Sequence, residues 1–517
     1  MSSIDAAPSS VAAASSGMDV ASRQDIDKLH GGAIGLTGVL LLTVTGAAPI
    51  TAMLGNVPIV VGNGTGIGAP AAFLFATVVL TIFSVGYAAM ARKVSAVGGF
   101  YSFISHGLGR ELGMAMALGS IVAYSVFEAS LAGGFAYFAA AKLSTWGITI
   151  AWPYLALVML AGVTALCYFD VKLSAAILGV ALVGEVVSLA IFDIGVFSHA
   201  GSGAHIDPAA LNPFAAFKGF DAPSPTMTAG VASIGLFFAF WSWVGFEMAP
   251  NYAEESKNPK KIIPMSLYIS VISLGLFYIV TSWAALSAYP SVAEAITAGQ
   301  TDASNFFLKP ASIFVGDWLN DVMSYLILTS SFACGMAFHN TAARYLYSLG
   351  RERILPAAVG KTHPKHKAPY VASFVQTAIA AVVVLVFAAA LGKDDPNQAF
   401  AGLYGLMALF GTTLILVAQA VVSLAIIAYF RREHPEDHHW FETLVAPVVA
   451  FLAQVAVIAM LVANLDFLSA GYAFAKWIPG LVLAILAIGV VGAVALKRTN
   501  RAKYDSIGRM IYEGVPE

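Results

Sequence analysis

Apolar stretches recur along the whole sequence, each at least as long as the roughly 20 residues that a helix needs to cross a bilayer. A backbone in lipid must satisfy its own hydrogen bonds, which an open sheet cannot do. The stretches therefore predict an all-α polytopic membrane protein with 12 transmembrane helices. They cover residues 34–61, 69–92, 112–140, 150–169, 173–197, 229–253, 264–288, 319–343, 369–391, 399–430, 443–464 and 475–496, and only Asp170 and Lys172 mark the break between the fourth and the fifth.

The composition excludes most other classes of protein. Of the 517 residues, 59% are hydrophobic and 11% are charged, whereas soluble domains average about 45–50% and about 25%. Too little polar surface is available for a cytosolic enzyme, a secreted disulfide scaffold or a disordered interaction protein. Cys167 and Cys334 lie in apolar stretches, where a thiol usually packs as a small hydrophobic group. The formal net charge of −2 gives no indication of nucleic-acid binding.

The basic residues are distributed unevenly between the two sides of the predicted bundle. With the amino terminus inside, 22 of the 27 lysines and arginines fall in cytoplasmic segments, as the positive-inside rule requires. A missed or additional helix would destroy this asymmetry. We therefore expect a multi-pass protein of the inner (plasma) membrane with both termini in the cytoplasm. The five basic residues on the outer side are Lys142, Lys218, Lys309, Lys393 and Lys476.

Two of the predicted helices contain an interruption near mid-membrane. The first carries Thr45-Gly46-Ala47-Ala48-Pro49-Ile50-Thr51, where proline removes a backbone donor and glycine lowers the cost of unwinding. The sixth carries Phe240-Trp241-Ser242-Trp243-Val244-Gly245-Phe246-Glu247, with a glycine and an acid. One such residue alone is usually a packing kink. Two interrupted helices spaced five helices apart are typical of transporters built from inverted five-helix repeats, with substrate bound at both interruptions.

Interruptions of this kind suit a zwitterionic ligand. The start of one half-helix exposes N–H groups that attract a carboxylate, and the end of the other exposes C=O groups that attract an ammonium. An amino acid supplies both charges at a suitable separation. We therefore expect an amino acid or a related amine as substrate.

Four segments, in this order, are similar to motifs of the amino acid–polyamine–organocation permeases. The first is 46–49 in the first interruption, and the second is 87–90 followed by 98–101. The third is 241–247 followed by 254–264, and the fourth is 344–356, ending at Pro369. The resemblance covers residues 34–430, and the last two helices match only in hydropathy.

The resemblance implies a 5+5 inverted-repeat core over residues 34–430 and two accessory helices over 431–496. Segments 1–33 and 497–517 are then cytoplasmic tails. The first tail is rich in Ala and Ser and lacks the basic and apolar regions of a signal peptide, so we expect it to be disordered. Many family members have Gly-Ser-Gly in the first interruption, where this chain has Ala47, Ala48 and Pro49. A substrate without an ordinary α-carboxylate is therefore also plausible.

The expected substrate site consists of residues from both interruptions. The resemblance implies that Trp241 lies across the substrate and that Glu247 faces its ammonium group or couples the gates. A carboxylate at this position would equally cap the N–H groups of the second half-helix, and tryptophan also commonly packs helices together. The full set is Thr45, Gly46, Ala47, Ala48, Ile50, Trp241, Gly245 and Glu247.

Two further acids, Glu185 and Glu128, lie at membrane depth without an obvious basic partner. By the resemblance, Glu185 occupies the position of a titratable lysine beside the first interruption, and desolvation favours its protonated form. Glu185 is thus the leading candidate for proton coupling and Glu128 the second, and the alternative for Glu185 is a permanently protonated or hydrogen-bonded structural acid. Ser330 and Ser331 would, by the resemblance, belong to a sodium site, although hydroxyls in membrane helices more often bond their own backbone.

The sequence therefore predicts a secondary active transporter that imports an amino acid or amine by proton symport and alternating access. Amino acid/amine exchange and sodium symport remain open as alternatives. An intramembrane enzyme is the rival class, but its nearest reactive pair, Ser331 and His339, lies about 12 Å apart along one helix. No cofactor, metal or nucleic acid is expected. The expected partners are the substrate, a proton or sodium ion and the lipid bilayer, in a monomer or homodimer.

Overall fold

The structure is a computed structural model that describes residue 29 and residues 31–94, 98–169, 171–436, 439–469 and 471–508. Within these ranges every extended regular element is a helix, and the only strand-like features are three isolated bridges. Ten helical stretches there are long and apolar enough to cross a membrane. The prediction of an all-helical polytopic protein is confirmed at this level. Most of the expected tail 1–33, the end of the tail 497–517 and Asp170 lie outside the described residues.

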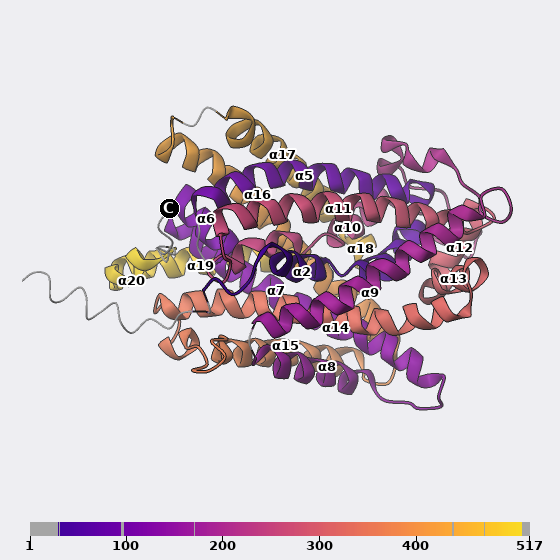
Figure 1. Cartoon of the computed structure of the whole chain (residues 1–517), viewed down its shortest axis with the longest axis horizontal. Coiled ribbons are helices and arrows are strands. Elements are labelled where there is room, and N and C mark those ends of the chain that lie inside the picture. Colours follow the sequence, from indigo (N-terminus) through magenta and orange to yellow (C-terminus); the bar gives the residue numbers. More distant parts are fainter. Residues whose placement is uncertain are drawn as a thin grey trace, which may run out of the picture.

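The longer helices run roughly along the longest axis of the molecule, with α20 Arg501–Ser506 at one end and α12 Val292–Thr301 and α13 Leu308–Phe314 at the other (Figure 1). The first stretch, Leu36–Lys93, changes direction at a 3₁₀ turn, Gly66–Gly68, before its last helix begins. The long helices are α2 Leu36–Ala47, α5 Ala69–Lys93, α7 Arg110–Ser144, α8 Trp152–Cys167, α9 Val171–Ser198, α10 Ala232–Trp241, α11 Pro259–Ser287, α14 Asp317–Arg351, α15 Tyr370–Leu391, α16 Gly405–Glu433, α17 Ala446–Ala463 and α19 Ile478–Thr499. The short ones are α3 Pro49–Thr51, α4 Val57–Ile59, α6 Gly99–Leu108, α12 Val292–Thr301, α13 Leu308–Phe314, α18 Leu465–Leu468 and α20 Arg501–Ser506.

The interrupted first helix lies in the middle of the bundle. α2 packs against α9, α11 and α14 and against a 3₁₀ segment, Phe246–Tyr252, that follows α10. Elsewhere in the bundle, glycines let pairs of helices approach closely. A Cβ at Gly107 of α6 would overlap the backbone of Ala425 in α16, and a Cβ at Gly489 of α19 would overlap the backbone of Ala115 in α7. The core is therefore held by close helix contacts rather than by large side chains alone.

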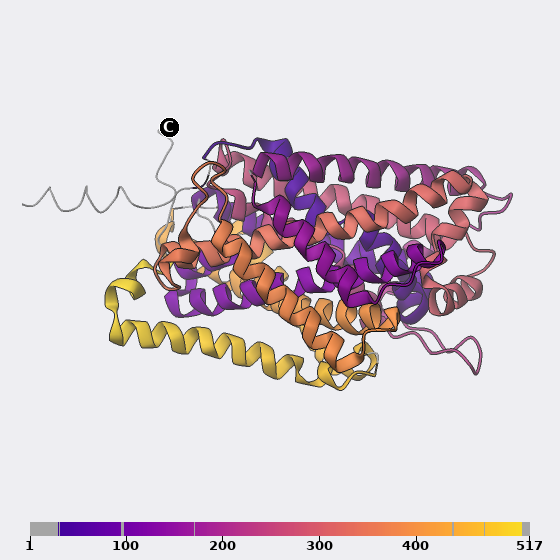
Figure 2. The same ribbon diagram turned by 90° about the horizontal axis from the view of Figure 1, so that it is seen from below.

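The last helices lie at the periphery. α17 packs against α5 and α16, and α19 packs along α7 and forms one edge of the molecule (Figure 2). Leu452, Leu483 and Val491 on these helices are exposed. Exposed apolar side chains on membrane-length helices are the expected surface towards lipid tails.

We call the end of the bundle that carries Arg92, Arg110, Arg351 and Lys497 the basic end, at the left in Figure 1. Ion pairs join its helices there. Arg92 pairs with Glu442, and Lys497 of α19 pairs with Glu111 of α7. At the opposite end, Lys142 of α7 pairs with Asp321 of α14.

A C-terminal segment formed by α20 and the residues up to Gly508 docks onto the basic end. Tyr504 and Ile507 are buried, and Arg110 pairs with Asp505. The Gly508 N–H donates to the Tyr101 hydroxyl of α6 at 2.8 Å and to Glu352, just after α14, at 3.1 Å. The Tyr101 hydroxyl in turn donates to Glu352. The C-terminal segment therefore bridges α6, α7 and the end of α14.

Candidate functional site

The first interruption lies at the predicted position and is centred on Ala48. α2 ends at Ala47, and Ala48 adopts a left-handed conformation with φ 44° and ψ 73°. Pro49 then begins α3, where its missing N–H costs no hydrogen bond. A left-handed conformation at a residue other than glycine costs roughly 1–2 kcal/mol, so the surrounding packing holds this backbone in place.

The second interruption lies between α10 and the 3₁₀ segment Phe246–Tyr252. α10 ends at Trp241, a turn follows, and Gly245 has φ 128°, which side-chain-bearing residues rarely adopt. The carboxylate of Glu247 accepts a hydrogen bond from the Gly245 N–H at 2.9 Å, and it thereby caps the second half-helix.

The two interruptions contact each other directly. A Cβ on Gly245 would lie 2.5 Å from the carbonyl carbon of Gly46, and one on Gly46 would lie 3.2 Å from the Gly245 Cα and overlap Met248. Real Cβ atoms essentially never come closer than 3.0 Å to other atoms, so Gly245 is required for the two backbones to meet. A Cβ on Gly46 would need the end of the Met248 side chain to move and the Gly245 backbone to shift by a few tenths of an ångström.

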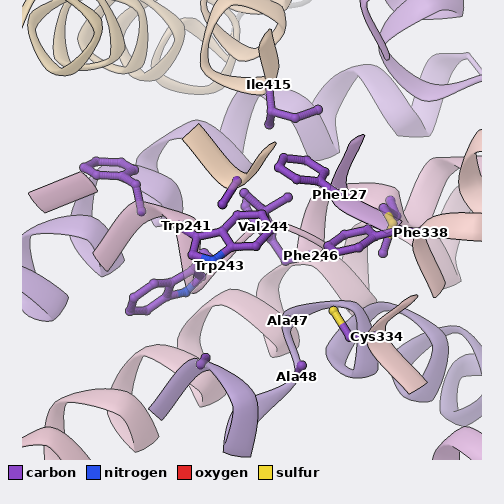
Figure 3. Packing of buried hydrophobic residues seen from close by; sticks show 14 of the residues in the cluster. Ala47, Ala48, Phe127, Trp241, Trp243, Val244, Phe246, Cys334, Phe338 and Ile415 are labelled. Atoms are coloured by element: carbon purple, nitrogen blue, oxygen red, sulfur yellow. The ribbon is translucent and has the colours of Figure 1, made fainter. Parts of the chain in front are cut away.

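A small cavity of about 20 Å³, lined by buried residues, lies where the interruptions meet. Figure 3 shows Trp241, Val244 and Phe338 around it, with Ala47, Ala48 and Cys334 on the side of α2 and α14. A cavity needs about 10–15 Å³ to hold a single water molecule, so the described conformation has no room for an amino acid. The cavity is lined by Gly46, Ala47, Ala48, Thr51, Ala52, Asn56, Leu131, Trp241, Ser242, Val244, Cys334, Phe338 and Tyr404.

Four of the predicted substrate residues, Gly46, Ala47, Ala48 and Trp241, line this cavity. The remaining four, Thr45, Ile50, Gly245 and Glu247, lie beside the interruptions but do not line it in this conformation.

Trp241 closes the cavity through a chain of hydrogen bonds. Its indole N–H donates to the Tyr404 hydroxyl at 3.1 Å, and that hydroxyl donates to the Asn56 side-chain oxygen at 3.0 Å. The Asn56 amide then donates to the Ser242 hydroxyl at 2.8 Å. The Trp241 ring also packs on Phe127, with a centroid distance of 4.7 Å. Tyr404 and Asn56 were not predicted from the sequence.

Both carboxylate oxygens of Glu247 are used within the protein. One accepts from the Gly245 N–H, and the other accepts from the Tyr124 hydroxyl at 3.0 Å. The Tyr87 hydroxyl also donates to the Glu247 backbone oxygen at 3.3 Å. This is the arrangement of the capping alternative rather than that of an acid facing the cavity.

Glu185 of α9 contacts the start of the half-helix after the first interruption. One of its oxygens accepts from the Ile50 N–H at 3.2 Å, and the other has no hydrogen-bond partner although it is buried. The hydroxyl of Ser330 lies beside this carboxyl group. Glu185 thus lies next to the first interruption in the structure.

Two side chains donate hydrogen bonds to the carbonyl oxygens at the end of α2. The Tyr278 hydroxyl donates to the Ala47 oxygen and the Cys334 thiol donates to the Gly46 oxygen, both at 3.1 Å. The Ser331 hydroxyl donates to its own helix at Ile327 and lies 3.4 Å from that of Thr51. These carbonyl oxygens therefore face hydrogen-bond donors in the described conformation.

The expectation that Glu128 lacks a basic partner is wrong. The Nδ1 atom of His339 in α14 lies 3.0 Å and 3.1 Å from its two carboxylate oxygens, and Gln376 of α15 donates to it at 2.7 Å. A further buried acid, Asp193 of α9, was not predicted, and it accepts from Thr281 of α11 at 2.7 Å. The only sequence signal for the Glu128–His339 and Asp193–Thr281 contacts is that each of these polar residues lies in an otherwise apolar helix.

A family model described as amino acid permease matches residues 38–503, which is most of the chain.

The chain belongs to the amino acid permease family.

The match continues past residue 430, where the resemblance in sequence motifs ended, and includes the two peripheral helices. A branched-chain amino acid permease of Bacillus subtilis (strain 168) is 24% identical over 447 residues, covering 83% of this chain and 84% of that protein. A low-affinity putrescine importer of Escherichia coli (strain K12) is 23% identical over 405 residues, covering 74% and 78%. A methylthioribose transporter of Bacillus subtilis (strain 168) is 26% identical over 233 residues, covering 44% and 45%.

The family and these relatives consist of transporters rather than enzymes. The permease is accordingly a multi-pass membrane transport protein, and the rival prediction of an intramembrane enzyme is set aside.

Proposed function

We propose that this permease imports an amino acid or a related amine by alternating access and that inward proton movement drives the import. The observation that carries the proposal is the contact between Glu185 and the first interruption. The Ile50 N–H is the group that a substrate carboxylate would be expected to bind, and the Glu185 carboxyl group occupies it.

This contact suggests how a proton and a substrate could be coupled. A charged Glu185 would compete with the carboxylate of a substrate for the Ile50 N–H. Protonation of Glu185 would weaken its hold on that N–H and remove the repulsion between two carboxylates. Proton and substrate would then favour each other's binding, which is the thermodynamic requirement for symport.

The substrate's ammonium group would contact Trp241 and the polar groups around it. The Tyr404 hydroxyl and the Asn56 side chain lie beside the cavity. Both have oxygens that can accept from an ammonium once the cavity opens. A tryptophan face over a desolvated cation would add about 1–2 kcal/mol. Thr45, Gly46, Ala47, Ala48, Ile50, Trp241, Gly245 and Glu247 remain the proposed substrate site, with Glu247 holding the second interruption.

Proton coupling is favoured over sodium coupling by the surroundings of the first interruption. Sodium would need oxygen atoms free to point at it, but the carbonyls of Gly46 and Ala47 accept from a thiol and a hydroxyl. Ser330 and Ser331 would supply only two hydroxyls. Sodium symport and amino acid/amine exchange are therefore the less favoured alternatives.

We also propose that the chain crosses the membrane 12 times. The stretch Leu36–Lys93 has 58 residues, about 87 Å of helix at 1.5 Å per residue, which exceeds the roughly 30 Å of a hydrocarbon core. Division at Gly66–Gly68 gives two crossings, and α8, with 16 residues, adds another. The basic end would then face the cytoplasm of a plasma-membrane protein. Residues 34–430 would form the 5+5 transport core and 431–496 the accessory helices.

Uptake into proteoliposomes tests the proposal. Labelled amino acids and amines, including branched-chain amino acids and putrescine because relatives carry those names, are offered under an imposed proton gradient, a sodium gradient or none. We expect accumulation of at least one compound with the proton gradient alone. Accumulation that follows only the sodium gradient would contradict proton coupling, and the absence of transport for the whole panel would contradict the substrate class.

A further inference from the structure

A buried chain of polar side chains joins α7, α14 and α15 beside the cavity but does not line it. Glu128 of α7 contacts Nδ1 of His339, and Nε2 of His339 lies 2.6 Å from the Ser373 hydroxyl of α15. Gln376 of α15 donates to Glu128 at 2.7 Å and accepts from Ser125 at 2.6 Å. The side chains of Glu128 and His339 have no exposed surface.

We propose that the Glu128–His339 pair is a proton-binding site of the transport cycle, separate from Glu185. The inference rests on the proposed function, because it assigns a second proton to the same import reaction. Ionisable groups at membrane depth are costly, and they mark proton relays and ion pathways more often than they serve as structural contacts. Histidine is also the side chain whose charge normally changes nearest to neutral pH.

The geometry around His339 accommodates both charge states without moving heavy atoms. When the imidazole is neutral, Nδ1–H donates to Glu128 and Nε2 accepts from the Ser373 hydroxyl. When the imidazole is charged, Nε2–H donates to the Ser373 oxygen instead, and the hydroxyl hydrogen turns towards its own helix. An amide partner with fixed donors and acceptors would satisfy only one of these states. The chain is therefore suited to gaining and losing a proton.

Few other charges face the pair. Among the described residues packed around it, α15 contributes the neutral side chains Ser373 and Gln376, α8 contributes the Cys167 thiol and α14 contributes Arg344. The Arg344 guanidinium is paired with Glu255 at 2.7 Å. The positive charge of Arg344 is thus already compensated, and the charge of the pair depends mainly on its own proton.

The pair is connected to the cavity through its immediate chain neighbours. Phe127 precedes Glu128, Phe338 precedes His339, and the two rings pack at 5.1 Å between centroids. Phe127 also packs on Trp241 at 4.7 Å, and Phe338 does so at 6.3 Å. A change in the charge of the pair that alters the contact between α7 and α14 would therefore be transmitted to the wall of the cavity.

The proton-to-substrate ratio in proteoliposomes tests the inference. Glu128→Gln and His339→Asn should each lower the ratio by one proton per substrate and retain substrate exchange between the two sides, which needs no net proton movement. Ser125→Ala is the matched control, because it removes a hydrogen bond from the same chain but no proton carrier, and it should keep the wild-type ratio. Wild-type ratios in both Glu128→Gln and His339→Asn would overturn the proposal and leave the pair as a structural contact.

A second measurement does not depend on transport. Infrared difference spectra of the purified wild-type protein with isotope-labelled histidine are recorded between about pH 5 and pH 8, the range in which histidine changes charge. We expect a histidine band coupled to a carboxylate band, and both should be lost in Glu128→Gln. Absence of any histidine band that depends on Glu128 would overturn the proposal, even if a variant folds too poorly for transport. If the wild type transports substrate without protons but shows both bands, the result would contradict the proposed proton symport but not proton binding by the Glu128–His339 pair.

Discussion

Gly46 and Gly245 bring the two interrupted helices into backbone contact, with only about the space of a hydrogen atom where each side chain would be. A Cβ on Gly245 would lie 2.5 Å from the Gly46 carbonyl carbon and 2.7 Å from the Ala47 nitrogen. The contact places the left-handed Ala48, the turn before Gly245 and the cavity within one small region. Its removal should therefore affect folding and transport together.

Gly245→Ala should destabilise the protein and abolish uptake. The added Cβ would overlap the other interruption, and the φ of 128° is unfavourable for alanine. Strain of this kind costs about 1–3 kcal/mol before the overlap is counted, so a clear fall in melting temperature is expected in detergent. Gly480→Ala is the matched control, since a Cβ there has no atom within 4 Å in α19. Wild-type stability and uptake for Gly245→Ala would contradict the described contact.

Tyr404→Phe should loosen the closed cavity. It removes the hydroxyl that links Trp241 to Asn56 and leaves both groups short of a partner. Each buried group left unpaired costs about 1–3 kcal/mol, and a loss of about 1.4 kcal/mol shifts an open–closed equilibrium tenfold.

The thiol of Cys334 reports this change because it lines the cavity and is buried. With Cys167 replaced by alanine, alkylation of Cys334 by a small maleimide should be roughly tenfold faster in Tyr404→Phe. Substrate should slow the reaction in both proteins. An unchanged rate would show that the hydrogen bonds through Tyr404 do not hold the cavity closed.

Glu185→Gln should strongly reduce proton-driven accumulation and preserve exchange. Glutamine keeps an oxygen that can accept from the Ile50 N–H but cannot release a proton. Asp193→Asn is the comparison variant, because Asp193 is a second buried acid of α9 that contacts Thr281 rather than the interruption. Accumulation is measured in proteoliposomes with and without a proton gradient. Full accumulation in Glu185→Gln would refute the proposed role of Glu185.

Reversing one charge of the Arg351–Glu254 ion pair at the basic end should destabilise the protein. Arg351 pairs with Glu254 at 2.7 Å, and both side chains are largely buried. Arg351→Glu places two carboxylates together, and breaking a buried pair typically costs about 3–5 kcal/mol. The double variant Arg351→Glu with Glu254→Arg restores an ion pair in the reversed order, so it should recover much of the melting temperature. Lys476→Glu, in an exposed pair with Asp466, should change stability by less than about 1 kcal/mol.

Docking of the C-terminal segment should weaken as pH rises. Burial raises the pKa of Glu352 to about 8 from its ordinary 4.5, although hydrogen bonds from Tyr101 and the Gly508 N–H act in the opposite direction. Undocking that exposes Glu352 to water would return its pKa towards the ordinary value, so the docked state binds the proton more tightly. Its stabilisation is fully present below about pH 4.5 and is lost as pH rises through about 8.

A nitroxide label at Ala502→Cys measures this docking, because Ala502 is exposed and both native cysteines are buried. The label should become more mobile as pH rises towards about 8. The change should be absent in Glu352→Gln, whose side chain does not titrate. A pH dependence that persists in this variant would assign the effect to another group.

Features that depend on local sequence were predicted correctly. Apolar length fixes the long helices, and Pro49 and Gly245 interrupt them because one lacks a donor and the other adopts φ 128°. The motifs at 254–264 and 344–356 were also recognised, and the structure joins them through Glu255–Arg344 and Glu254–Arg351.

Features that depend on helix rotation were not predicted. Membrane helices such as α7 and α14 are apolar on most faces, so the sequence does not show which face of each helix meets the other. For this reason Glu128 seemed unpaired although it contacts His339, which is 211 residues away in sequence. The link from Trp241 to Tyr404 was missed for the same reason, since packing sets it rather than hydropathy.

The small size of the cavity, about 20 Å³, bears on the step in which the empty transporter reorients. A transporter that only exchanges substrates does not need an occluded state without substrate. A transporter that carries out net transport must reorient without substrate in each cycle. In the proposed cycle the Glu185 carboxyl group would take the place of a substrate's carboxylate on the Ile50 N–H, while the Trp241 N–H donates to Tyr404 at the cavity. An internal group would then replace the substrate in the empty transporter, which favours a cycle in which the empty transporter returns by itself.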